Sequence, residues 1–508
     1  MSIRLPVAAL FAAALLPFSA VAADDGDLQN IRQQLDQLKA AYEARIRALE
    51  ARLEDLQQRV GSGAAVPASP NAGAASVPSP NSGRNSVAVK SPPASDANVV
   101  PPTAPAPSIA GAGTASTPTG SGSQASASAF NPAISLILNG SYANLSRDPA
   151  LYRLQGFIPS GGEVGPGARS FSLGESELSL AASIDPTFSG RLTASITPDD
   201  RVAVEEALFE RQGLFDGATL RVGRFLSSIG YLNSQHAHAW DFFDAPLAYQ
   251  AFFGGQLQTD GLHIHWLAPT ERYVELGAEI GAGRGFPGSE SRRNGIGSGA
   301  LMLHVGDDIG DSASWRTGVS YLLNRATDRT YADVNAGGAT VTNAFSGDSR
   351  TWIVDGILKW APGGNATRTN LKVQGEYFRR TESGTLTQDP IAATVASSSG
   401  YRSTQSGWYL QAVYQFMPQW RTGLRYDRLD SGAPRIGAVD SGALTAADFP
   451  ILASARPSRA TAMVDYSLSE FSRLRLQIAA DRSNPAATDR QLYVQYIMSL
   501  GAHGAHSF

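Results

Sequence analysis

The chain has 508 residues, a formal net charge of −4 and no cysteine. Its length exceeds that of one ordinary domain, so several segments are expected. The near-neutral charge argues against a nucleic-acid partner, and the lack of cysteine excludes disulfides, thiolate metal sites and an acylated N-terminal cysteine. Mean hydropathy is −0.15, and no apolar run long enough for a transmembrane helix follows the N-terminus. A transmembrane β-barrel stays possible, because its lipid-facing and lumen-facing residues alternate and average out.

Residues 1–23 are predicted to be a secretory signal peptide. Arg4 supplies the positive start, Leu5 to Leu16 form the apolar core, and Ala20-Val21-Ala22 is an A-x-A cleavage signal. The alternative, a membrane anchor, is disfavoured because the apolar core is short and lacks a stop-transfer flank.

Residues 24–60 are predicted to be a periplasmic α-helical coiled coil. Apolar residues recur there at spacings of three and four, with one stutter between Tyr42 and Ile46. A single helix of this length is marginal in water, which favours pairing with copies of itself; a lone helix on another surface is the alternative. Residues 61–130 are rich in Ala, Ser, Pro, Gly and Thr, so they are predicted to be a disordered linker.

Residues 131–508 are predicted to be an all-β domain, a 16-stranded antiparallel transmembrane β-barrel. Segments of about ten residues alternate apolar and polar side chains between clusters of Gly, Asp, Asn and Pro, as barrel strands do. The candidate strands are residues 133–143, 170–185, 188–198, 200–210, 218–226, 258–267, 272–283, 298–306, 313–323, 350–361, 369–381, 406–417, 419–429, 459–468, 471–482 and 490–500.

The predicted connections alternate between short and long. Short ones lie at 185–187, 268–270, 417–419 and 467–469. Long ones lie at about 144–169, 227–257, 324–349, 383–405 and 430–458. Short periplasmic turns and long outer loops are typical of bacterial outer-membrane barrels, and an even number of strands places both barrel ends in the periplasm.

The faces of single strands support a membrane barrel. In the strand predicted at 350–361, Trp352, Val354, Leu358 and Trp360 share one face, and the other face carries Ile353, Asp355, Ile357 and Lys359. Aromatic residues near strand ends fit a lipid-interface girdle. The alternation weakens around Gly174 and around Glu205-Glu206, which predicts a bulge or a boundary error at each point. The terminal Phe508 is expected to be read by the outer-membrane assembly machinery.

The run Arg221-Val222-Gly223-Arg224-Phe225-Leu226-Ser227-Ser228-Ile229-Gly230 resembles a strand-to-loop segment of the phosphate-selective porins, the porin O and P family. This resemblance implies a trimeric 16-stranded channel. A subgroup of that family, often labelled zinc-regulated or TonB-dependent outer-membrane receptors, resembles this chain more closely in residues 231–250, 260–270 and the tail 499–506. TonB-dependent receptors have about 22 strands and a folded plug, which the linker at 61–130 lacks the apolar residues to form.

The third outer loop, about 227–257, is expected to fold inward and narrow the pore, as the resemblance to 16-stranded porins implies. Its aromatic content fits that position, because such a loop would be ill placed in water. Its candidate constriction residues are His236, His238, Trp240, Asp241 and Asp244. The predicted strands add an acidic wall of Glu275 and Glu279, and basic residues at Arg316, Arg421, Arg425, Arg473 and Arg475. The chain has only four lysines, and mixed charges are typical of a general porin rather than of a phosphate trap.

All seven histidines lie in the barrel region. His236 and His238 in the third loop, with His263 and His265 on one lumen-facing strand, are candidate ligands for zinc, with Asp241 or Asp244 adding oxygen. The alternative is that these histidines are ordinary polar lining. No cofactor is otherwise expected.

The expected function is passive diffusion of small hydrophilic solutes or ions across the outer membrane. Two alternatives stay open: a zinc- or anion-selective uptake channel using lumen histidines or arginines, and a barrel that anchors an envelope tether. An enzyme is not expected, since no G-x-S-x-G motif occurs. Expected partners are outer-membrane lipid and lipopolysaccharide, two further copies in a homotrimer, and the assembly machinery.

Overall fold

The computed structural model describes residues 132–161, 164–197, 201–289, 294–389 and 397–501. The predicted signal peptide, coiled coil and linker, together with Phe508, lie outside these residues. Within the described ranges, no helix has both the length and the apolar character needed to cross a membrane.

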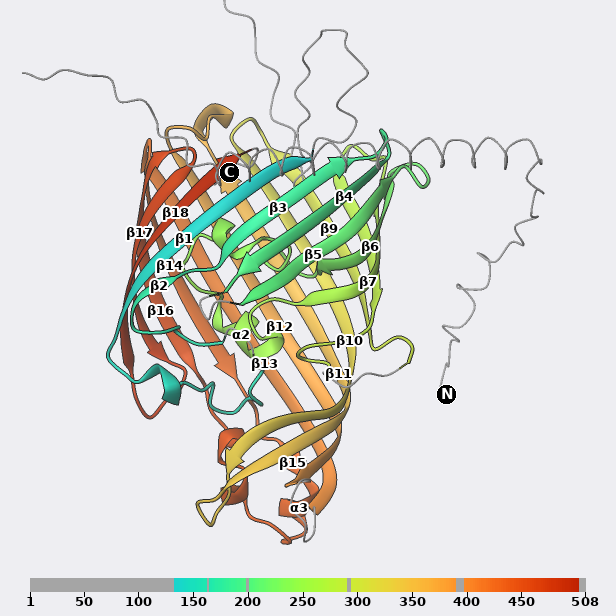
Figure 1. The fold of residues 1–508 in the computed structure, drawn as a ribbon, viewed down its shortest axis with the longest axis vertical. Coiled ribbons are helices and arrows are strands. Elements are labelled where there is room, and N and C mark those ends of the chain that lie inside the picture. Colours follow the sequence, from blue (N-terminus) through green and yellow to red (C-terminus); the bar gives the residue numbers. More distant parts are fainter. Residues whose placement is uncertain (1–131, 162–163, 198–200, 290–293, 390–396, 502–508) are drawn as a thin grey trace, which may run out of the picture. The chain divides into compact units, whose positions relative to one another are not determined.

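The described strands form one antiparallel sheet that closes on itself (Figure 1). Sixteen of them make the ring, which closes where β1 (Ala133–Leu145) pairs with β18 (Asp489–Gly501). Two short strands lie beside the ring: β2 (Ser170–Leu173) pairs with β1, and β15 (Arg435–Ile436) pairs with β13. The other ring strands are β3 (Ser176–Ser183), β4 (Phe188–Ile196), β5 (Val202–Gln212), β6 (Ala218–Leu226), β7 (Gln258–Leu267), β8 (Tyr273–Gly281), β9 (Ser298–Ile309), β10 (Ala313–Val334), β11 (Thr340–Trp360), β12 (Asn370–Gln388), β13 (Ser397–Met417), β14 (Trp420–Asp430), β16 (Ser458–Ser469) and β17 (Ser472–Arg482).

Each of the sixteen predicted strands corresponds to one strand of the ring, with β2 and β3 together covering the second. The predicted loops at 324–349 and 383–405 were wrong, because β10 to β13 continue through most of both segments as long hairpins. The two-residue alternation persists there: Tyr331 is buried inside the barrel, whereas Val334 is exposed. These inward side chains pack with the helical turns of residues 436–452, which gives the longer strands a core of their own.

Both predicted irregularities are confirmed. Opposite β5, Thr193 pairs with Glu206 and the next residue, Ala194, pairs with Val204, so Glu205 is the extra residue of a β-bulge. The bulge lets two successive carboxylates reach the lumen. At Gly174 the second predicted strand is interrupted between β2 and β3, and a Cβ there would collide with the side chain of Asn139.

The barrel has an apolar outside and a polar inside. Along β11, Trp352 and Val354 are 51% and 47% exposed, whereas the alternating residues Ile353 and Asp355 are 0% and 2% exposed. Aromatic side chains also pair across the outer face, as Trp420 does with Tyr466 at 4.7 Å. A water-soluble sheet would bury this apolar face, so the exposure pattern fits a lipid surround.

The connection from Ser227 to Leu257, called the inner loop below, lies inside the barrel (Figure 1). It contains η3 (Ala237–Ala239) and α2 (Leu247–Phe253), and every residue of α2 is buried. The main apolar core is formed between this loop and wall residues such as Phe378 and Tyr409. The remaining helical turns are η2 (Pro149–Leu151), η4 (Pro362–Gly364), α3 (Gly437–Asp440), η5 (Ala446–Asp448) and η6 (Pro450–Leu452).

Candidate functional site

The inner loop is closed at its base by one asparagine. The Asn233 amide donates to the carbonyl oxygens of Ser227 and Leu257 at 2.7 and 2.9 Å, and its oxygen accepts from the Leu257 N–H at 2.7 Å. The predicted acidic-wall residue Glu279 holds the same end, accepting from the Ser227 hydroxyl at 2.6 Å and the Ser228 N–H at 2.8 Å. The loop therefore leaves and re-enters the wall as a fixed hairpin.

Glu376 on β12 is a second anchor, which the sequence did not single out as a loop contact. It accepts from the backbone N–H groups of Tyr231 and Leu232 and from the hydroxyls of Tyr249 and Tyr409, at 2.6–3.2 Å. These donors satisfy a buried carboxylate that would otherwise be costly. Gly230 precedes the anchor with φ +63°, and a Cβ at that position would collide with the Glu376 carboxylate.

Asp244 and Asp241 fasten the tip of the inner loop to cations of the barrel wall. Asp244 pairs with Arg425 at 2.8 Å and Arg459 at 2.5 Å. Asp241 pairs with Lys372 at 2.6 Å, and Arg421 lies 3.5 Å away. Burial raises the pKa of both aspartates, but the neighbouring cations outweigh it and hold each pKa below its usual value. Both side chains are therefore anionic anchors at neutral pH.

The predicted basic wall exists on β14 and β17, yet most of it lies beneath the loop. Arg473 and Arg475 donate to the backbone carbonyls of His238 and Trp240 at 2.7 and 2.9 Å. Asp465 accepts from Arg475 at 2.8 Å, and Arg425 is buried as well. Of this predicted wall, Arg421 keeps partial exposure.

The water-exposed charges of the lumen lie mainly on the half of the barrel where the short turns are found. Arg316 is partly exposed, donates to the Gly230 carbonyl at 3.2 Å and stacks over Tyr231. Glu275 is also partly exposed and contacts His304 at 3.3 Å. Three further members of this group were not predicted: Arg191, Glu210 and Arg221.

Four of the predicted metal ligands form two separate pairs. His263 and His265 lie together on β7, with ring centroids 5.3 Å apart, and His263 packs against Phe225. His236 and His238 lie in the inner loop with ring centroids 5.8 Å apart. Among the residues that the structure describes, the group with converging metal-ligand atoms contains only His236 of these four.

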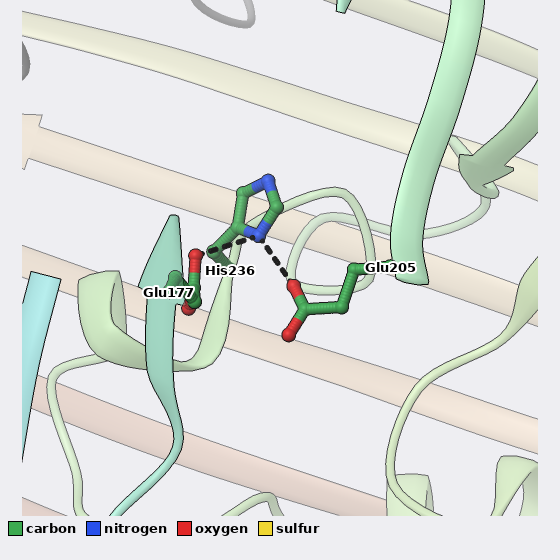
Figure 2. Close-up of side chains that lie close together, drawn as sticks. All are labelled: Glu177, Glu205 and His236. Carbon is green, nitrogen blue, oxygen red and sulfur yellow. Dashed lines mark hydrogen bonds and ion pairs between the residues drawn. The ribbon is translucent and has the colours of Figure 1, made fainter. Parts of the chain in front are cut away.

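His236 is surrounded by glutamates from the wall (Figure 2). Its Nδ1 lies 3.2 Å from Glu177 of β3 and 2.9 Å from Glu205 of β5, and its Nε2 lies 3.2 Å from Glu206. Burial lowers the pKa of His236, but the three carboxylates outweigh burial and raise it well above the usual value. The sequence signal for this cluster was the irregular alternation at Glu205-Glu206.

No family model matches the chain. A protein of Aquifex aeolicus strain VF5, described as "Uncharacterized protein", is 32% identical over 406 residues, which are 75% of this chain and 80% of the relative. The chain belongs to the family of this Aquifex protein.

Solved structures of outer-membrane proteins are similar at lower identity. A loop-deletion mutant of OmpT from Vibrio cholerae matches 73% of this chain and 99% of its own at 10% identity, with a TM-score of 0.46. The outer membrane channel DcaP of Acinetobacter baumannii matches 73% of this chain and 97% of its own at 10% identity, with a TM-score of 0.40. An anion-selective porin from Comamonas acidovorans matches 73% of this chain and 99% of its own at 13% identity, with a TM-score of 0.43. Scores below 0.5 do not by themselves assign a function.

Proposed function

We propose that the protein is an outer-membrane channel through which small hydrophilic solutes or ions diffuse passively. One observation carries this proposal: the closed barrel exposes apolar and aromatic side chains outward and keeps charged ones inside. A closed barrel satisfies every backbone polar group between its strands, so it suits a hydrocarbon surround. Its polar interior then supplies the path for water and solutes.

The inner loop is the proposed constriction. It is bound to β8 through Glu279, to β12 through Glu376 and to β14 and β16 through Asp244. Because the anchors hold both the start and the middle of the inner loop, this loop does not move with the outer loops. The pore size is therefore set by a loop with fixed geometry.

Weak ion preference is part of the proposal. The buried arginines are paired with Asp244, Asp427 and Asp465, so they add little to the field felt by a passing ion. The partly exposed lumen charges include more cations than anions, which favours anions slightly. The members of this group are Arg191, Glu210, Arg221, Glu275, Arg316, Lys359, Lys372 and Arg421. A dedicated phosphate trap would need unpaired cationic donors in a ladder.

The proposed setting is the bacterial outer membrane, with lipid and lipopolysaccharide around the wall and a homotrimer as the assembly. Both chain ends of the barrel domain would lie on the periplasmic side. The even number of ring strands supports the placement of the ends. The trimer and the role of Phe508 rest on the resemblance and on the sequence pattern.

Single-channel recording in a planar bilayer tests the channel. The folded protein is expected to give discrete, ohmic conductance steps with a slight anion preference. A variant in which Gly-Gly replaces residues 237–253 should conduct more per step, while Asp348→Asn on the exposed outer hairpin should match the parent. Folded protein without conductance would overturn the channel, and unchanged conductance in the shortened variant would overturn the constriction.

The alternative role as an envelope anchor depends on residues 24–130. A chain lacking them should conduct like the full chain if the protein is a channel alone. If cells with this deletion lose envelope integrity while conductance persists, the N-terminal segment has a tethering role of its own.

A further inference from the structure

We propose that Glu177, Glu205 and His236 bind one divalent transition-metal ion, which fastens the inner loop to the barrel wall. The ion's influence on the pore rests on the proposed channel function, whereas its binding does not. The site differs from the four-histidine site expected from the sequence, since two of its ligands are glutamates of β3 and β5.

The ligand atoms already converge. Glu177 Oε2 and Glu205 Oε2 lie 3.2 and 2.9 Å from His236 Nδ1, and one ligand atom from each residue lies within 4.8 Å of the other two. Metal–ligand bonds of about 2.0–2.2 Å place tetrahedral donors roughly 3.3–3.6 Å apart. Small side-chain rotations therefore suffice to accept an ion, with a water completing the set.

A second layer of contacts holds these ligands in place. The other ring nitrogen of His236, Nε2, lies 3.2 Å from Glu206 Oε2, so Nε2–H can donate to Glu206 while the ion takes the place of the proton on Nδ1, which is released to solvent. His238 Nδ1 lies 2.7 Å from Glu177 Oε1 and steadies the first carboxylate. Carboxylates that accept the remaining N–H of a ligating histidine are the usual support of metal centres.

The β-bulge creates the site. A regular strand would send Glu205 and Glu206 to opposite faces, but the extra residue brings both to His236. The second oxygen of Glu205, Oε1, is buried and has no hydrogen-bond partner among the described residues. Three carboxylates thus meet one imidazole, with Arg191 3.5 Å from Glu206, and a divalent ion would balance the two carboxylates that bind it.

The donor set indicates the class of metal. One imidazole nitrogen and two carboxylate oxygens, without thiolate, suit Zn²⁺, Mn²⁺ or Fe²⁺ better than Ca²⁺, which takes about 6–8 oxygen ligands. Zn²⁺ and Mn²⁺ are therefore the probes. The metal site would join the inner loop to β3 and β5. This part of the wall is separate from the strands β14, β16 and β17, whose arginines bind the loop.

Metal binding to the full-length folded protein in detergent tests the site. Zn²⁺ competition against a chromophoric chelator, and Mn²⁺ paramagnetic resonance, should give one ion per chain. We expect Glu205→Gln and His236→Gln to weaken binding by at least about 100-fold, and Glu206→Gln by roughly 10–100-fold, as for outer-shell partners. Glu210→Gln, a matched change on the same strand, should bind like the parent.

Three outcomes overturn the site: no stoichiometric ion in the parent, parental affinity in Glu205→Gln, or loss of binding in His265→Gln but not in His236→Gln. Heat-dependent gel mobility confirms that each variant is folded. If His236→Gln does not fold, the binding affinity of Glu205→Gln carries the test. Micromolar Zn²⁺ should also alter the conductance of the parent and leave Glu205→Gln unaffected. A chain that binds the ion but never conducts refutes the channel alone, and one that conducts without binding refutes the site alone.

Discussion

Replacing Asp244 with asparagine probes how the inner loop is held. The carboxylate accepts from Arg425, Arg459 and Gln477, and all of these partners are buried. Asparagine keeps the shape of the side chain and removes the charge. Two guanidinium groups then lose one of the counter-ions that they share, so the loop should detach more readily from the wall.

The size of the effect follows from these contacts. Breaking a buried ion pair by removing one partner costs about 3–5 kcal/mol. Asp427 stays 3.1 Å from Arg425 and 3.6 Å from Arg459, so part of the compensation survives and the lower end, about 3 kcal/mol, applies. A loss of that size raises the population of detached loop about 100-fold.

Chymotrypsin digestion of the folded protein measures that population, because the loop tip carries Trp240, Phe242 and Phe243 and cleavage follows the fraction that is open. Conductance noise in bilayers gives a second measurement. The control is Asp348→Asn, whose exposed pair with Arg325 contributes about 0–1 kcal/mol at most. If Asp244→Asn and the control are cleaved at the same rate, the ion pairs do not hold the loop.

Three further predictions concern the same lumen. Glu376→Gln should destabilise the loop by about 1–3 kcal/mol, because an amide turns its NH₂ toward donors that now meet a carboxylate; equal urea midpoints for variant and parent would contradict this. The depressed pKa values of Asp241 and Asp244 mean that their stabilisation is complete above the unfolded carboxyl pKa of about 3.9 and is lost as pH falls through the folded values. The excess conductance noise of Asp244→Asn over the parent should therefore stay constant between about pH 7 and pH 5 and shrink only below about pH 4, and an excess that already shrinks at the higher values would rule Asp244 out as an anionic anchor. Lys359→Gln removes one lumen cation on β11, so the reversal potential in a salt gradient should move toward cation preference by a few millivolts, whereas Lys359→Arg should keep the parental value.

Much of the barrel was predictable because its signal is local. Strand faces alternate every two residues, so Trp352 and Ile353 disclose opposite faces without knowledge of any partner strand. The bulge at Glu205 was visible for the same reason, as a break in that period. The lengths of β10 to β13 were missed because polar residues outnumber apolar ones in their outer halves. The packing of Tyr331, Phe345 and their neighbours shows that these segments remain strands.

The candidate site was predictable in its loop and not in its contacts. Aromatic content marked residues 227–257 as a loop that belongs inside a barrel, and that placement needed no coordinates. The partners of Asp244 lie 181 and 215 residues away along the chain, so no local pattern pairs them.

The sequence by itself determined the number of ring strands and their faces, because these depend on periodicity and on turn residues, and the aromatic content of residues 227–257 indicated the loop that turns inward. Only the tertiary structure decided which charges neutralise one another and which remain in water. The pairing of β3, β4 and β5 and the inward course of the inner loop bring Glu177, Glu205 and His236 together, and the register between strands selects the carboxylates that face each arginine. Register and closure are properties of the whole ring, and for that reason the lumen's chemistry appears only after folding.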